Sequence, residues 1–235
     1  MSTVTPELIP IFPLSHVLMP GAALPLRIFE PRYRQLLADI TGAEGQRRFG
    51  VIALLAGHEV EAGLIDDTTQ LADIGTVAEI IEVEPEPDGT SAVLTVGSQR
   101  FKVLEVLGST GTPYLQARVR ILSETLGDLP DGLAARTRDL SAQYQQLIGR
   151  ASGAAPELTP YPNDPIALSY RVANEAPLPA VERQGLLAAE SAALRLRTVA
   201  RLLRRESILL RETRTIPVEP SVLTGGLLQS GLGRN

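Results

Sequence analysis

The spacing of hydrophobic residues changes once along the chain, near residue 129, and this change limits the folds that the sequence can adopt. Before it, apolar residues recur at every second position in short runs separated by turn residues, which is typical of β-strands. After it, they recur every three or four positions, as on one face of a helix. Strands followed by helices favour the α+β class. We therefore expect a β-rich part over 1–128, a helical bundle over 129–214, and an extended or disordered tail over 215–235.

The β-rich part divides into short strands joined by tight turns. The strands are expected at 8–14, 22–29, 49–56, 74–84, 91–96, 101–107 and 114–122. Asp88-Gly89 predicts a hairpin turn, and Gly97-Ser98-Gln99 predicts another turn. Pro31 suits the first turn of a helix that ends near Gly42. This arrangement favours a small, partly closed antiparallel β-barrel.

The helical part begins with a segment over about 131–148 that Asp131 is expected to cap. Asn163 or Asp164 is expected to cap the next helix, which has Pro165 in its first turn. A short helix then runs to about Ala189, and the longest helix covers 190–213.

Arginines are concentrated on and just after this longest helix. They are Arg195, Arg197, Arg201, Arg204, Arg205, Arg211 and Arg214. They either contact nucleic acid or an acidic partner, or cover apolar surface and pair with Glu190, Glu206 and Glu212. The second interpretation is favoured, because ion pairing along exposed helices is common.

The overall charge and the residue types present exclude several functions. A net charge of −5 argues against general nucleic-acid binding, which needs a basic surface. Without cysteine there are no disulfides, thiolate nucleophiles or cysteine-bound zinc. The stretch 8–26 lacks charged residues, but its four prolines are incompatible with a membrane-spanning helix. No secretory signal is evident, so we expect a soluble cytoplasmic protein that does not enter membranes.

Catalytic patterns are equally scarce. A phosphate-binding loop needs a lysine after its glycine-rich turn, but Gly45–Gly50 is followed by Val51. Lys102, the only lysine, lies within an alternating strand and is expected to face solvent rather than to activate a serine. The acidic run of Glu79, Glu82, Glu84 and Glu86 is expected to form a solvated face rather than an acid/base pair.

The two histidines, His16 and His58, offer a metal site only in combination with Asp66, Asp67 or Asp73. Neither lies in a recognised ligand spacing, so both are expected to be solvated surface residues. We expect no cofactor and no metal, and no enzymatic activity.

One set of motifs, in order and spacing, closely resembles the N-terminal substrate-binding domain of Lon proteases over residues 8–124. The motifs are Ile9–Leu14, Met19–Gly21, Leu24–Tyr33, Phe49–Ile52, Ile74–Ala78, Asp88–Thr90, Gly97–Phe101 and Pro113–Leu115. The resemblance implies a PUA-like β-barrel followed by a helical bundle. It also implies a role in substrate recognition. The ATPase and protease modules of Lon have no counterpart in the sequence, so a stand-alone form is expected.

Within the barrel, Arg27 and Arg100 each interrupt an apolar strand segment. They either pair with carboxylates or project to solvent, and a structural role is favoured for both.

The leading hypothesis is a non-catalytic module that binds unfolded polypeptide or a specific protein partner. Binding surfaces of this kind are exposed aliphatic or tyrosine patches, and Tyr33, Tyr161 and Tyr170 are the candidate binding residues. Two alternatives stay open: an RNA-binding role, which the PUA-like barrel suggests and the acidic charge disfavours, and a hydrolase or peptidase with an unrecognised site. The sequence leaves the oligomeric state open.

Overall fold

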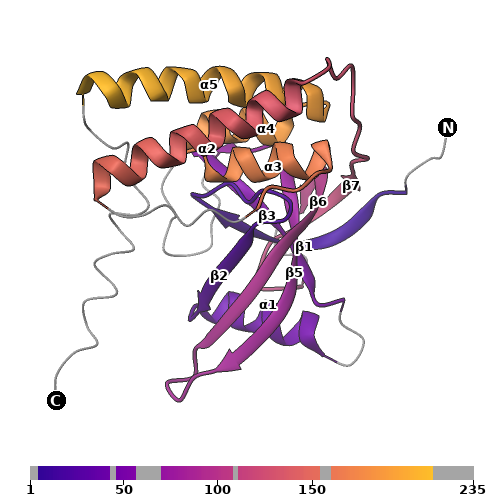
Figure 1. The fold of residues 1–235 in the computed structure, drawn as a ribbon. Helices are drawn as coiled ribbons and strands as arrows, with labels where there is room; N and C mark the ends of the chain where they lie inside the picture. Colours follow the sequence, from indigo (N-terminus) through magenta and orange to yellow (C-terminus); the bar gives the residue numbers. More distant parts are fainter. Residues whose placement is uncertain (1–4, 43–45, 57–69, 108–110, 154–159, 214–235) are drawn as a thin grey trace, which may run out of the picture. The chain divides into compact units, whose positions relative to one another are not determined.

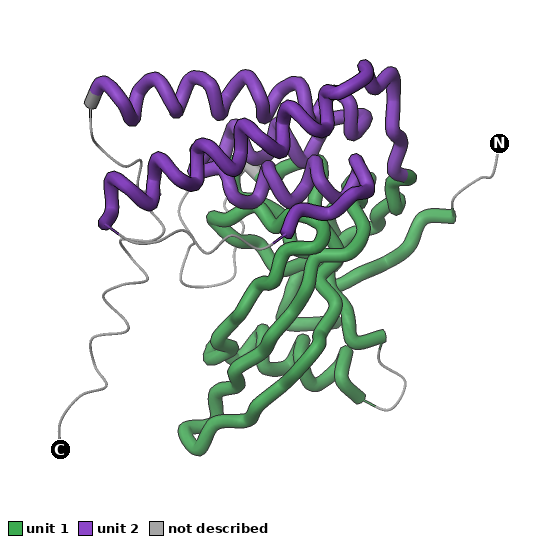
Figure 2. Tube along the Cα trace, viewed as in Figure 1, with its two compact units in different colours: residues 1–123 green, residues 124–235 purple. Residues whose placement is uncertain are grey.

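The computed structural model describes residues 5–42, 46–56, 70–107, 111–153 and 160–213 (Figure 1). The chain divides into two compact units, Met1–Ser123 and Glu124–Asn235, which Figure 2 colours separately. The predicted tail at 215–235 lies outside the described residues. Among the described helices, none combines the length and the hydropathy that a bilayer crossing requires.

The first unit is a small barrel made of five of its seven strands. These five are β1 (Glu7–Leu14), β3 (Arg48–Ala56), β5 (Ile74–Pro85), β6 (Ser91–Leu107) and β7 (Gln116–Ile121). Their order is β1-β7-β6-β5-β3, and a pairing of β1 with β3 closes the ring. That closing pair is parallel, with Ile11–Leu14 beside Gly50–Ala53, whereas the other pairs are antiparallel. The predicted barrel is therefore confirmed, with one parallel pair that the strand pattern did not indicate.

The barrel core is centred on Phe101, whose side chain is fully buried. Its ring lies against Gly50 and Gly75, where an added methyl group would collide with the ring. At Gly75 the same methyl would also meet the backbone oxygen of Val51 at 2.5 Å. The two glycines therefore leave the space that the aromatic ring fills, because protein cores are close-packed.

The turn predicted at Gly97-Ser98-Gln99 is wrong, because β6 runs through it as one strand of 17 residues. A glycine is required at position 97 for a reason other than a turn. The backbone oxygen of Met19 lies so close to it that a Cβ atom would clash. Gly97 also donates to the backbone oxygen of Ala22 at 2.9 Å and accepts from Gly21 at 2.8 Å. A close approach between two backbones explains this glycine.

The length of β6 creates an arm beyond the barrel (Figure 1). Strand β5 pairs along one edge of β6. Along the other edge, the second half of β6 pairs with β7 in the barrel, and the first half pairs with β2 (Ala23–Ile28). The arm consists of β2, the end of β5 and the start of β6. Helix α1 (Pro31–Thr41), which begins at the predicted proline, lies beside it. The last strand, β4 (Gln70–Leu71), pairs with β3.

The described part of the second unit contains four helices: α2 (Leu133–Ser152), α3 (Pro165–Glu175), α4 (Ala180–Ala188) and α5 (Ala192–Thr213). Asp164 caps α3 as expected, its carboxylate accepting from the backbone of Ala167 at 2.8 Å. The cap predicted at Asp131 is wrong. Gly132 precedes α2 in the left-handed conformation, with φ of 71°, and no side chain caps the helix.

The core of the second unit contains a fully buried cation, Arg195 on α5. Its guanidinium donates to Ser169 Oγ at 2.8 Å and to the backbone oxygens of Leu186 at 2.9 Å and Ala189 at 3.2 Å. It also lies 3.8 Å from the centre of the Tyr170 ring. The expectation that the arginines of this helix cover its surface is therefore wrong for Arg195. The N–H groups of Arg195 are bonded to buried oxygen atoms, and a buried oxygen without a hydrogen-bond donor would itself lower the stability of the fold.

Candidate functional site

The outer face of the arm combines exposed apolar side chains with carboxylates. Strand pairing places Ala92, Leu94 and Val96 of β6 in a central column on this face. On one side, β2 contributes Ala23, Pro25 and Arg27, and on the other, β5 contributes Glu79, Glu82 and Glu84. The opposite face carries the buried residues Ile28, Ile80 and Val93. We call the outer face, with these nine residues and Ile81, the arm face.

A β-bulge enlarges the apolar part of the arm face. The register of β5 against β6 shifts between Ile80 and Glu82, so Ile81 is an extra residue in its strand. The side chain of Ile81 is 57% exposed and that of Leu94 is 37% exposed. The regular alternation predicted for 74–84 therefore breaks here, because Ile81 and Glu82 are both exposed. Contiguous exposed apolar side chains of this kind are typical of binding surfaces.

The carboxylates at the tip of the arm are neutralised within the chain. Arg27 lies 3.0 Å from Glu86 and 2.9 Å from Asp88. Hydrogen bonds from Thr90, together with the charge of Arg27, lower the pKa of Asp88 below its usual value. Arg27 thus has the structural role that the sequence favoured.

In contrast, the three carboxylates on the arm face have no cationic partner among the described residues. Glu79, Glu82 and Glu84 are all exposed. No salt bridge or side-chain hydrogen bond in that part of the chain involves them. An open pocket of about 390 Å³ adjoins the Glu79 end and is lined by Gln46, Arg47, Arg48, Glu79 and Ile80. Glu79, Glu82 and Glu84 are solvated, as the sequence predicted, and they border an apolar column. The fourth member of the predicted run, Glu86, is half-buried and paired with Arg27.

The free edge of the arm is poorly suited to pairing with another strand. Among the described residues, β2 pairs only with β6. The backbone N–H of Gly97 donates to the backbone oxygen of Ala22, just before β2, so Ala22 faces β6. Because successive residues of a strand direct their N–H and C=O groups to opposite sides, those of residues 23, 25 and 27 face the free edge. Pro25 has no N–H to donate there, and proline on an edge strand is a recognised protection against strand addition. A ligand is therefore better accommodated on the arm face than along its edge.

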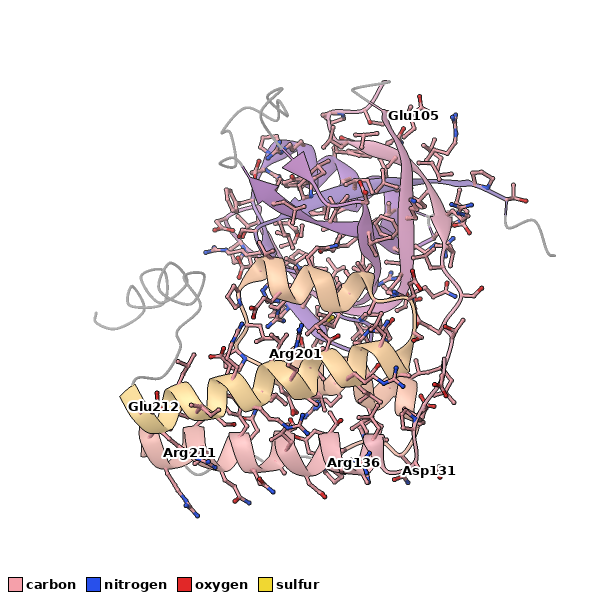
Figure 3. All side chains as sticks on the ribbon, turned by 90° about the horizontal axis from the view of Figure 1, so that it is seen from above. Glu105, Asp131, Arg136, Arg201, Arg211 and Glu212 are labelled. Atoms are coloured by element: carbon pink, nitrogen blue, oxygen red, sulfur yellow. The ribbon has the colours of Figure 1, made fainter. Side chains whose placement is uncertain are left out.

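Several charged side chains of the helical unit form ion pairs within it. Arg205 donates two hydrogen bonds to Glu182, at 2.5 and 2.7 Å, and two to Glu206, at 2.6 and 2.9 Å. These hydrogen bonds lower the pKa of Glu182 and raise that of Arg205. The predicted pairing with Glu206 is confirmed, whereas no ion pair of Glu190 or Glu212 is present among the described residues. Figure 3 shows α2 and α5 side by side, with Arg201 and Arg211 on α5.

Of the three candidate tyrosines, Tyr33 belongs to the first unit, and Tyr161 and Tyr170 belong to the second. Tyr33 is buried on α1 and stacks on Phe12, with ring centres 4.0 Å apart. Tyr170 is also buried, and its hydroxyl donates to Glu124 at 2.7 Å. Tyr161 is half-buried and contacts Ser141 and Glu175, each at 2.9 Å. Burial is the largest cause that raises the pKa of Tyr161 to about 12. Each tyrosine packs within its own unit, and its role in binding stays a prediction.

The residues considered for catalysis or metal binding are dispersed. Lys102 is exposed on β6, as predicted, whereas Arg100 of the same strand is buried. His16 is half-buried in the turn after β1. His58, Asp66 and Asp67 lie outside the described residues. Within the described ranges, no three histidine, aspartate or glutamate side chains are grouped as metal ligands.

Sequence reasoning missed the apolar part of the arm face. Leu94 sits in an alternating strand and looks like any other half-buried position. Ile81 becomes exposed through the bulge, which depends on the pairing of β5 with β6. The available signal was the row of glutamates at 79, 82 and 84, whose uneven spacing indicates a break in the alternation.

Relatives among characterised proteins are Lon proteases. The chain is 27% identical over 210 residues to Lon protease of Anaeromyxobacter dehalogenans, a match that covers 88% of this chain and 24% of the relative. It is 31% identical over 213 residues to Lon protease 2 of Herpetosiphon aurantiacus, covering 88% and 25%. The chain thus spans about a quarter of the length of these relatives.

Solved structures of similar fold are Lon N-terminal domains. A Lon N-terminal domain protein from Xanthomonas campestris matches with a TM-score of 0.59 and 23% identity, over 84% of this chain and 98% of that one. The N-terminal domain of a Mycobacterium avium complex Lon protease matches with a TM-score of 0.55 and 19% identity, over the same shares. These likenesses show the fold. The family model of the substrate-binding domain of the ATP-dependent protease La (Lon) matches residues 8–205, and the chain therefore belongs to this family.

Proposed function

We propose that this chain binds polypeptide segments that expose apolar side chains, and that it does so through the arm face. The observation that carries the proposal is the apolar column of β6, widened by the exposed Ile81 and bordered by Pro25. Membership of a substrate-binding family supports the same function. Folded proteins bury most of their large aliphatic side chains, whereas unfolded chains expose them. An exposed apolar surface such as the arm face therefore favours unfolded or partly unfolded ligands.

The chemistry of the arm face suits binding rather than catalysis. It presents aliphatic side chains, three unpaired carboxylates and Arg27, which is paired with Glu86 and Asp88. None of these side chains is a nucleophile activated by a neighbouring base. A few aliphatic side chains provide modest binding energy once ordering costs are subtracted. We therefore expect affinities in the micromolar range for a single short segment, at roughly 1–100 µM.

The test is a binding titration with a fluorescently labelled, permanently unfolded protein. In the test variant, Ile81→Ser and Leu94→Ser remove the apolar side chains from the arm face. The matched control carries Leu104→Ser and Val106→Ser, which alter side chains of similar exposure (43% and 39%) in the barrel half of the same strand. We expect the test variant to bind at least about tenfold more weakly, since two aliphatic contacts are lost, and the control to bind like the wild type.

Three results would contradict the proposal. The first is unchanged binding by the test variant when its circular dichroism spectrum matches that of the wild type. The second is an equal loss in the control. The third is displacement of the polypeptide by structured RNA with a steep salt dependence, which would favour RNA as the ligand.

A further inference from the structure

Three carboxylates form a row along one side of the apolar column of the arm face. Glu79, Glu82 and Glu84 lie on β5, paired across the strands with Val96, Leu94 and Ala92. Neighbouring strands are about 4.8 Å apart, so the backbone of each glutamate lies about this distance from the backbone of the apolar residue opposite it. A ligand over the column would therefore lie within reach of all three charges.

The row lacks the internal neutralisation found at the tip of the arm. There, Arg27 lies within 3.0 Å of both Glu86 and Asp88. No lysine, arginine or histidine among the described residues forms an ion pair with Glu79, Glu82 or Glu84. Arg48 lies opposite Glu79 across the strands but pairs with Glu7. Like charges on one strand face repel one another, and a cation supplied from outside relieves that repulsion. The apolar column beside them lowers the local dielectric constant, which strengthens attraction to such a cation.

From these features we infer that the arm face selects polypeptide segments in which aliphatic residues are interspersed with lysine or arginine. The inference rests on the proposed function and names its substrate class. Aliphatic side chains of such a segment cover Leu94, Ile81 and Pro25. The stems of lysine and arginine are long enough to cross one strand spacing along apolar surface and place their charges at the glutamates.

The selectivity is expected to be moderate and sensitive to salt. Exposed ion pairs each contribute little, so three of them predict a preference of about tenfold for a cationic over a neutral segment at low ionic strength. The preference should shrink as salt rises, because the screening length falls to about 8 Å at 0.15 M. A segment rich in aspartate or glutamate should bind more weakly than the neutral one.

The experiment uses three labelled peptides of equal length and equal leucine and valine content, interspersed with lysine, glutamine or glutamate. Their affinities are compared for the full chain and for the variant Glu79→Gln, Glu82→Gln, Glu84→Gln. The matched control is Asp131→Asn, Asp139→Asn, Glu212→Gln, which makes the same change in net charge at exposed sites of the helical unit. Circular dichroism and thermal melting establish that both variants are folded.

We expect the full chain to prefer the lysine peptide about tenfold over the glutamine peptide. The arm-face variant should lose this preference while its affinity for the glutamine peptide stays unchanged, and the control should keep the preference. Equal affinities of the full chain for all three peptides would overturn the inference but not the proposed function. An equal loss in the control would also overturn it, because net charge alone would then be responsible. Failure of every peptide to bind the full chain would instead overturn the proposed function.

Discussion

The glutamate row of the arm face and two arginines of the helical unit differ in how their charges are satisfied. In the helical unit, Arg195 is buried among hydrogen-bond acceptors and Arg205 is paired with two glutamates. On the arm face, three glutamates have no ion-pair partner among the described residues and border exposed apolar side chains. Charges that are satisfied internally hold a fold together, whereas unpaired charges beside apolar surface are available to a ligand.

The charge totals agree with this difference. Residues 1–123 contain 15 acidic and nine basic side chains, a formal charge of −6. Residues 124–235 contain 12 acidic and 13 basic side chains, a formal charge of +1. The acidity of the whole chain thus belongs to the first unit. The overall net charge of −5 concealed this asymmetry, although it is readable from the sequence.

The largest expected effect on stability is at Arg195. Replacing it with methionine removes three hydrogen bonds, to Ser169, Leu186 and Ala189. It also removes an ion pair with Glu124 at 3.8 Å. We expect a loss of about 3 kcal/mol in the free energy of unfolding, measured by urea denaturation. Arg204→Met, at an exposed position of the same helix, is the control and should change stability by less than about 0.5 kcal/mol. Similar losses in the two variants would break the contrast between internal and surface charges.

In the barrel, Gly75→Ala is expected to cost about 2 kcal/mol, because the added methyl collides with Phe101 and with the backbone of Val51. Gly185→Ala is the matched control in the helical unit. No atom lies within 4 Å of its added methyl, and alanine favours a helix, so it should stabilise the protein by about 0.5 kcal/mol. Thermal unfolding of both variants tests the prediction. A neutral Gly75→Ala would show that the barrel core is looser than described.

A smaller effect is expected at Glu182, whose pKa is lowered by its hydrogen bonds to Arg205. A carboxylate with a lowered pKa in the folded state contributes stability above its usual pKa of 4.5 and loses that contribution as the pH falls further. Because Arg205 is nearly half exposed, Glu182→Gln should cost no more than about 0.5 kcal/mol at pH 7. The difference from the wild type should shrink as the pH falls below 4.5 and disappear once Glu182 is protonated in the folded state. A cost that persists there would assign the effect to packing instead of charge.

The smallest effect on stability is expected on the arm face. Leu94→Ser should change the free energy of unfolding by less than about 0.5 kcal/mol, because its side chain is exposed and lies outside the cores. Chemical denaturation checks this value alongside the binding titration. A large loss would mean that Leu94 has a structural role, and it would remove the main distinction between the arm and the helical unit.

Features set by nearby residues were predictable from the sequence. The helix start at Pro31, the Asp164 cap and the approximate spans of β3 and β5 depend on residue patterns within a few positions. Features set by distant residues were not. Gly97 looked like a turn because Met19, whose backbone approaches it, lies 78 positions away. Arg195 looked like its exposed neighbours, because its burial depends on acceptors from α3 and α4.

The candidate site was only partly predictable for the same reason. The glutamate row at 79, 82 and 84 was visible in the sequence and expected to be solvated. The exposure of Leu94 and Ile81 depends on which face of the arm is covered and on a bulge in the pairing. Both are properties of the assembled sheet.

Strand β6, which runs without interruption from the arm into the barrel, also has a consequence for the kinetics of binding. Its barrel half is anchored by Phe101, so the arm face is held by a rigid support before any ligand arrives. A preorganised surface loses little conformational entropy on binding. Among ligands of equal charge, differences in affinity should therefore appear mainly in their dissociation rates, while association rates stay similar.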